Sequence, residues 1–232
     1  WLKKSMNLNH LFKFPEFKKK LSKRVNPYLF VNELSNVLNK NSIIIGDTGS
    51  HLTWLMQDFK IKYGQIMFSA FGNSPMGYAL PASIGAQIIN KKKKVIAFNG
   101  DGSIQLNIQE LQTLSKLNLP IKIIIMNNHG YGIIQQFQDL YLNKRHEASN
   151  RVVSNPNFKF LSKAFKINYN FIKKNNDIKK IKKIINSNKA EIIEVDIEDK
   201  EKIIPKLEFG KPIDNLSPQI NLNSIKNYLS TS

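Results

Sequence analysis

The segment VIAFNGDGSIQLNIQELQTLSKLNLPIKIIIMNN, residues 95–128, contains the pattern that decides the fold. Residues 95–98 form a short apolar run that is typical of a buried strand, and the turn Gly100-Asp101-Gly102 follows it. Apolar residues then recur at helical spacing from 104 to 117, and Pro120 ends that pattern before a second apolar run at 121–126. The order strand, glycine turn, helix, strand predicts a βαβ unit.

Two oxygen-bearing side chains follow the two predicted strands. Asp101 comes after the first strand, and Asn128 ends the second. Neighbouring parallel strands would bring both to the carboxyl edge of the sheet, where open α/β folds bind ligands. A carboxylate and an amide oxygen suit Mg²⁺, which usually shares its ligands with phosphates. Each piece alone is also compatible with an ordinary turn or strand end, but the combination favours a magnesium diphosphate site.

The glycines around these residues support an anion site. Gly102 lets the backbone approach a phosphate, and Ser103 begins the predicted helix, whose first N–H groups would face the anion. Gly130 and Gly132 flank Tyr131 in a loop that would offer a carbonyl oxygen to the metal and N–H groups to the phosphate.

Taken together, these motifs resemble the signature of thiamine diphosphate-dependent enzymes, and most closely that of the acetolactate synthase group. The distance of 128 − 101 = 27 positions between Asp101 and Asn128 fits that signature without a gap. The resemblance implies that Asp101, Asn128 and the carbonyl of Gly130 hold Mg²⁺ on the cofactor diphosphate. It also implies cofactor contacts from the other residues of these loops, namely Gly100, Gly102, Ser103, Tyr131, Gly132 and Ile133.

Two further blocks are similar to family segments. Residues 71–82, FGNSPMGYALPA, resemble the part that holds the aminopyrimidine ring, with Met76 supporting the bent cofactor and the carbonyl of Ser74 accepting from its amino group. Residues 47–51, DTGSH, resemble the loop that touches the diphosphate, which implies contacts from Gly49, Ser50 and His51. Ser74 stands where the family often has glycine, and Ser50 where it often has glutamine.

The predicted helix 133–142 would form one wall of a substrate pocket. Ile133 and Phe137 are four positions apart and share a helix face. Acetolactate synthases usually have tryptophan at the position of Phe137, so the pocket for the second substrate would differ here. The glutamate that activates the cofactor in this family matches nothing in the chain. Glu110 is interpreted as structural or solvated.

By resemblance, the chain is the C-terminal part of a thiamine diphosphate- and Mg²⁺-dependent 2-keto acid decarboxylase or carboligase, a transferase or lyase. The expected partners are the 2-keto acid, the rest of a longer chain and a second subunit of a homo-oligomer. We therefore expect residues 1–232 alone to be inactive. The resemblance leaves FAD open as a further cofactor. Two alternatives stay open: a simple 2-keto acid decarboxylase with another substrate, and a non-catalytic homologue kept for assembly.

The remaining pattern predicts a doubly wound α/β fold, with a mainly parallel sheet and helices on both faces. Residues 1–26 are expected to be an interdomain connector, 27–205 the diphosphate-binding domain, and 206–232 a C-terminal tail with a short helix at 223–229. Further helices are expected at 29–38, 52–59, 77–89, 158–165 and 178–185, and strands at 43–46, 169–172 and 191–195.

Composition restricts the class of protein. The absence of cysteine excludes a disulfide framework, and no apolar run reaches membrane-spanning length, so a cytoplasmic protein is expected. The formal net charge of +18 is compatible with a nucleic-acid or membrane partner. However, the lysines are scattered and no motif combines basic with aromatic residues. We therefore expect neither partner.

Overall fold

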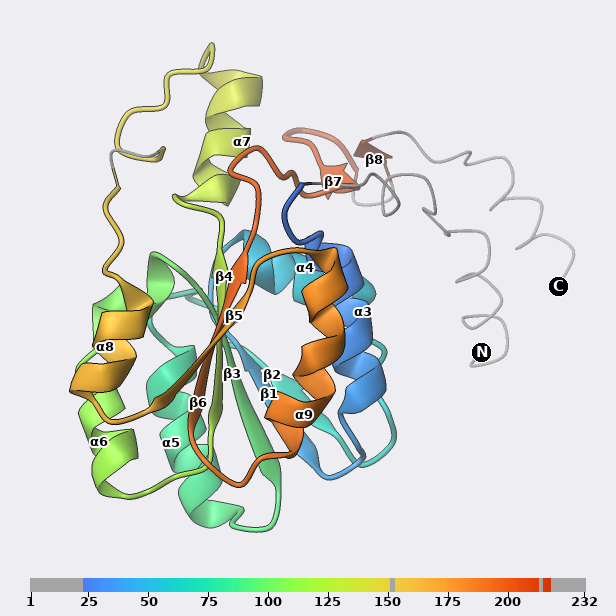
Figure 1. The fold of residues 1–232 in the computed structure, drawn as a ribbon. Coiled ribbons are helices and arrows are strands. Elements are labelled where there is room, and N and C mark those ends of the chain that lie inside the picture. The colour runs from blue at the N-terminus through green and yellow to red at the C-terminus, as the bar shows by residue number, and fades with distance from the viewer. Residues whose placement is uncertain (1–22, 151–152, 213–214, 218–232) are drawn as a thin grey trace, which may run out of the picture. The chain divides into compact units, whose positions relative to one another are not determined.

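The computed structural model describes residues 23–150, 153–212 and 215–217 (Figure 1). Within them, six strands form one sheet in the order β2-β1-β3-β4-β6-β5, and every neighbouring pair is parallel. The strands are β1 (Ser42–Gly46), β2 (Ile66–Phe68), β3 (Lys94–Gly100), β4 (Lys122–Asn127), β5 (Asn168–Ile172) and β6 (Glu191–Asp196). The parallel sheet confirms the predicted doubly wound α/β class.

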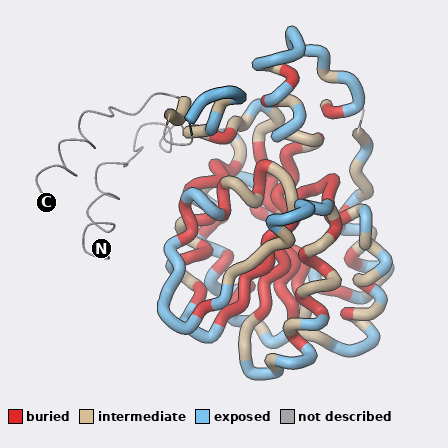
Figure 2. Tube along the Cα trace, turned by 180° about the vertical axis from the view of Figure 1, so that it is seen from behind, coloured by how far each residue is buried: buried red, intermediate tan, exposed pale blue. Residues whose placement is uncertain are grey.

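Helices cover both faces of the sheet, as Figure 1 shows. One face carries α3 (Pro27–Val37), α4 (Ser50–Asp58) and α9 (Ile181–Asn186), and the other carries α5 (Ala79–Ile89), α6 (Glu110–Lys116) and α8 (Phe158–Ala164). Strand residues alternate between the two cores: Ile44 and Ile96 join one, while Ile43 and Val95 join the other. Both faces are therefore buried, which explains the uninterrupted apolar runs (Figure 2).

Local sequence explains where the first helix begins. The side chain of Asn26 accepts hydrogen bonds from the N–H groups of Tyr28 and Leu29, at 3.0 and 3.1 Å. Pro27 occupies the first helical position, where its fixed φ is favourable and its missing N–H is not needed. Helix α3 therefore starts two residues before the predicted boundary.

Apart from shifted helix ends, the structure differs from the predicted elements in three places. The strand β2 was not predicted, because its three residues are too few for a periodic signal. The helix predicted at 104–117 is divided into the 3₁₀ helix η1 (Ser103–Asn107) and α6. Similarly, residues 178–185 are divided between the 3₁₀ helix η2 (Asn175–Lys180) and α9.

The start of α5 also differs from the prediction. Helix α5 begins at Ala79, not at Gly77, because Gly77 has a φ of 87°, outside the helical region. The carbonyl of Gly77 accepts a hydrogen bond of 2.8 Å from the side chain of Asn107, at the end of η1. A Cβ at Gly77 would lie 2.9 Å from the side chains of Leu106 and Asn107, so the tight turn of η1 packs directly on this backbone.

Residues 21–202 form one compact unit. The amide of Val25 donates to the carbonyl of Asp196, so residues before the predicted boundary at 26 already pair with the end of β6. In the second unit, the described residues include an antiparallel pair, β7 (Lys206–Leu207) with β8 (Leu216–Ser217). The helix predicted at 223–229 lies outside the described residues, as does most of the predicted connector. Among the described helices, none has the length and apolar character needed to span a bilayer.

The strand order reverses direction at β1. The chain passes from β1 outward to β2 and returns to place β3 on the other side of β1. Such a switch point leaves a crevice at the carboxyl ends of the strands, where ligands of open α/β sheets bind. Helix α7 (Gly132–Tyr141) extends from the end of β4 beyond this edge (Figure 1).

Candidate functional site

A cavity of about 340 Å³ lies at the carboxyl ends of β1, β3 and β4. Four segments contribute to its wall: one loop from the end of each of these strands, and the segment before α5 that contains Met76. The lining residues are Thr48, Gly49, Ser50, His51, Met76, Gly100, Asp101, Gly102, Ser103, Asn128, Gly130, Tyr131, Gly132, Ile133 and Ile134. The cavity thus brings together residues that are up to 86 positions apart, 134 − 48 = 86, and includes most of the predicted cofactor and metal residues.

Asp101 connects the loop after β3 to the loop after β4, and both loops carry predicted metal ligands. Its side chain is 2 % exposed, and its Oδ2 accepts a hydrogen bond of 2.9 Å from the amide of Gly130. Burial raises the pKa of this carboxyl, while hydrogen bonds from Asn155 and Gly130 act in the opposite direction. Within the described part of the chain, no lysine, arginine or histidine forms an ion pair with Asp101. A bound cation would offset the cost of burying this charge.

Asn128 lines the same cavity. It is buried, and among the described residues its Nδ2 has no hydrogen-bond partner. A Cβ at Gly132 would lie 2.5 Å from this Nδ2 and 3.0 Å from Oγ of Ser50. Gly132 therefore leaves the space that Asn128 occupies. An unsatisfied buried polar group is costly. We therefore expect the complete site to offer a hydrogen-bond acceptor to this NH₂ group.

His51 forms another part of the wall, near the start of α4. Burial lowers the pKa of His51 to about 3, so the imidazole is neutral at physiological pH. Its Nε2 is buried without a partner in the described structure. The ring lies against the backbone of Gly49 and Gly100, where an added Cβ would come within 2.7 Å of it. The two glycines therefore leave space for a ring that offers a neutral hydrogen-bonding group.

Asp47 has a role that the sequence did not reveal. It is fully buried, and its two carboxylate oxygens accept hydrogen bonds of 3.0 Å from the amides of Gly77 and Ala79. These bonds connect the end of β1 to the segment that contains Met76. An acidic residue directly after a strand was the available signal, but its partners 30 and 32 positions away could not be read from spacing.

Two predicted site residues lie outside this cavity. Ser74 is exposed, with a φ of 45°, and its hydroxyl donates to the carbonyl of Phe71. Phe137 is 39 % exposed, and its ring lies 4.9 Å from that of Tyr141. Ile133 does line the cavity, together with Ile134. The sequence analysis did not name Ile134 or Thr48 as site residues.

The donor set is compatible with Mg²⁺ bound to a diphosphate. The described residues contain no group of three or more His, Cys, Asp or Glu side chains that could hold a metal on their own. Mg²⁺ rarely uses such a cage, and takes one or two carboxylates, waters and substrate phosphates. For such a site, Asp101 would offer the carboxylate and Asn128 an amide oxygen, and the Gly130 amide is hydrogen-bonded to Asp101.

Fold and cavity together define a parallel α/β domain with a cavity at its switch point. The family model "Thiamine pyrophosphate enzyme, C-terminal TPP binding domain" matches residues 47–195, which is more than half of the chain. Thiamine pyrophosphate is the same molecule as thiamine diphosphate. The chain therefore belongs to this family and contains its C-terminal cofactor-binding domain, as the sequence analysis predicted.

Relatives agree with this assignment. The acetolactate synthase large subunit of Cyanidium caldarium is 34 % identical over 191 residues, which are 82 % of this chain and 32 % of the relative. That of Lactococcus lactis is 30 % identical over 192 residues, 83 % of this chain and 33 % of the relative. The isozyme 1 large subunit of Escherichia coli is 39 % identical over 114 residues, 49 % and 20 % respectively. The chain thus spans at most about a third of the length of these relatives.

Proposed function

We propose that this chain supplies the diphosphate- and Mg²⁺-binding part of a 2-keto acid decarboxylase or carboligase that resembles acetolactate synthase. The observation that supports it best is the hydrogen bond between Asp101 and Gly130, which holds the carboxylate against the loop that contains Asn128. A second subunit and further domains would complete the active site, including the glutamate that activates the cofactor.

Each wall of the cavity has a separate role in this proposal. Mg²⁺ would be held by Asp101, Asn128 and the carbonyl of Gly130. The diphosphate would lie against the backbone of Gly100, Gly102 and Gly132, which have no side chains to exclude it. Neutral His51 would form a hydrogen bond to the bound group without adding charge. Ile133 and Ile134 would exclude water from the reacting end. When bound, thiamine diphosphate supplies a carbanion-stabilising centre for 2-keto acid chemistry.

The test is a calorimetric titration of the complete protein with thiamine diphosphate in the presence of Mg²⁺. Asp101→Ala should abolish measurable Mg²⁺-dependent binding, because the diphosphate charge then lacks its cation. Asp177→Ala, which removes an aspartate paired with Lys180 on η2, is the matched control and should bind as the wild type does. Unchanged affinity of the Asp101→Ala protein would refute the metal assignment.

Product analysis separates the alternatives. With saturating cofactor and a panel of 2-keto acids that includes pyruvate, a carboligase joins two substrate molecules with loss of CO₂, as in acetolactate from pyruvate, whereas a simple decarboxylase releases CO₂ and the aldehyde of its own substrate. A non-catalytic homologue forms neither product. The buried carboxylate of Asp101, which has no ion-pair partner among the described residues, favours an enzyme over a scaffold, because a scaffold has no need for a metal carboxylate.

A further inference from the structure

Asn155 contacts the predicted metal carboxylate from outside the cavity. It lies shortly before α8, 54 positions after Asp101, and its Nδ2 donates a hydrogen bond of 2.6 Å to Oδ2 of Asp101. The same Oδ2 accepts the amide of Gly130 at 2.9 Å. Two donors from separate segments thus converge on one oxygen, which restricts rotation of the carboxylate.

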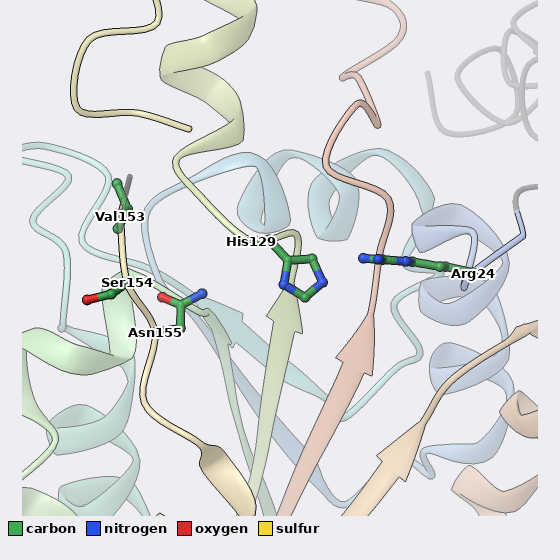
Figure 3. Close-up of a pocket in the computed structure, with 5 residues that line it drawn as sticks. All are labelled: Arg24, His129, Val153, Ser154 and Asn155. Carbon is green, nitrogen blue, oxygen red and sulfur yellow. The ribbon is translucent and has the colours of Figure 1, made fainter. Parts of the chain in front are cut away.

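Asn155 lines a second, more polar pocket, next to the loop that contains Asn128 and Gly130. This pocket of about 460 Å³ is lined by Arg24, His129, Val153, Ser154 and Asn155. Figure 3 shows Asn155 and Arg24 directed toward His129 from opposite sides. Asp196 accepts from Arg24 at 3.1 Å and lies 3.0 Å from Nε2 of His129. Two sets of contacts therefore hold the loop that contains Asn128 and Gly130. Asp196 contacts its His129, and Asn155 contacts Asp101, which in turn accepts from the amide of Gly130.

Gln105 fixes the orientation of the Asn155 amide. Its Nε2 donates to Oδ1 of Asn155 at 2.9 Å and to the backbone carbonyl of Asp101 at 3.2 Å. Because Oδ1 of Asn155 accepts from Gln105, the Nδ2 group must be the end that faces Asp101. Gln105 lies on η1, so the tight turn after the Gly-Asp-Gly motif contributes directly to this arrangement.

We propose that Asn155 is a positioning residue of the metal site, which engages Oδ2 of Asp101 so that Oδ1 is the oxygen presented to Mg²⁺. Mg²⁺ requires nearly ideal octahedral geometry, whereas Ca²⁺ accepts flexible coordination. A carboxylate that can rotate should therefore weaken Mg²⁺ binding more than Ca²⁺ binding. Outer partners of metal ligands commonly change metal affinity by about 10- to 100-fold.

The experiment measures thiamine diphosphate binding to the complete protein by calorimetry, at increasing Mg²⁺ and, separately, at increasing Ca²⁺. Asn155→Ala should raise the Mg²⁺ concentration at half-saturation by about 10-fold or more, and the Ca²⁺ concentration by clearly less. Asn155→Asp fills the same space but directs an oxygen at Oδ2, so it should weaken Mg²⁺ binding at least as much. Ser154→Ala, from the same segment, is the control.

A purely structural role makes a different prediction. If Asn155 only supported the fold, Asn155→Ala would lower thermal stability with cation binding unchanged, or both cations would lose affinity equally along with thermal stability. Either result would overturn the inference. Because the inference rests on the proposed function, the wild-type titration is decisive for that function: absence of cation-dependent binding there would refute the proposed function itself. Wild-type-like selectivity in Asn155→Ala would refute only the role of Asn155.

Discussion

Gly130 occupies a position where a side chain would collide with fixed backbone. Its φ is 155°, and an added Cβ would lie 2.8 Å from the carbonyl oxygen of Ser149. The same loop donates to Asp101 through the Gly130 amide. Backbone atoms cannot move away as a flexible side chain can. The loop itself must therefore shift if residue 130 becomes larger.

We predict that Gly130→Ala destabilises the protein by about 1–3 kcal/mol, the usual range for overpacking, and weakens Mg²⁺-dependent cofactor binding. Urea unfolding and calorimetric titration measure the two effects. Gly85→Ala is the control, because its Cβ would meet nothing within 4 Å and it lies inside α5. Equal stability and equal binding of the Gly130→Ala protein would contradict the expected collision.

Asn155 illustrates what sequence alone could not supply at the residue scale. Its contact with Asp101 spans 54 positions and depends on the path of the chain before α8. The same holds for Asp47, whose partners lie 30 and 32 positions away. Motif spacing identified the residues that lie next to glycine turns, but it carries no information on side chains that arrive from another segment.

At the scale of elements, α7 combines a wall of the cavity with an exposed apolar surface. Ile133 and Ile134 in its first turn line the cavity. One turn further, Phe137 packs on Tyr141 and remains 39 % exposed. The sequence placed Ile133 and Phe137 on one face, but the cavity of this chain ends before Phe137.

We predict that Phe137→Trp changes the choice of acceptor while leaving cofactor affinity nearly unchanged. An indole is larger than a phenyl ring, and acceptors that differ by a methylene are discriminated by roughly 1–3 kcal/mol in a hydrophobic pocket. Product ratios from competing keto acids measure the effect. Phe160→Trp, which enlarges an exposed phenylalanine on α8, is the matched control. If the ratios do not move, Phe137 does not line the acceptor pocket.

Secondary-structure patterns gave the main elements but not their local divisions. The apolar period from 104 to 117 is regular, yet the chain forms η1 and then α6, with Asn107 bonded to the backbone of Gly77. That bond is a tertiary contact, so helical periodicity could not indicate it. Strand β2 pairs with β1 at the edge of the sheet, where three residues suffice once the partner is present.

At the scale of the whole molecule, a buried polar cluster lies at the amino edge of the sheet, at the opposite ends of the strands from the cavity. Lys122 begins β4, is fully buried, and its Nζ donates to Oγ of Ser187 at 2.7 Å and to the carbonyl of Lys189. Burial is the main cause that lowers the pKa of Lys122 to about 8, although Glu191 acts in the opposite direction. This lysine therefore titrates below its ordinary range.

We predict that stability rises between about pH 8 and pH 10.5 because of Lys122. In that range the unfolded chain, with the ordinary pKa of 10.5, binds more protons than the folded chain, with a pKa of about 8. At 1.36 kcal/mol per pKa unit, the contribution is at most about 3 kcal/mol. Urea unfolding at pH 8 and pH 10 measures the rise.

The Lys122→Met protein should show a smaller rise over the same interval. Lys91→Met, which removes an exposed lysine, controls for the change in net charge. Equal slopes in the Lys122→Met and Lys91→Met proteins would show that Lys122 does not titrate in this range. Cofactor binding should be little affected, because the cluster lies at the end of the strands opposite the cavity.

The sequence by itself determined the βαβ unit, the parallel sheet and the loops that carry Asp101 and Asn128. Those features follow from local causes: apolar periodicity, glycine turns and polar residues directly after strands. Only the tertiary structure decided the strand order, the cavity wall shared by four segments and the contact of Asn155 with Asp101. These depend on which distant segments pack together, and that choice is made by burying both faces of the sheet at once.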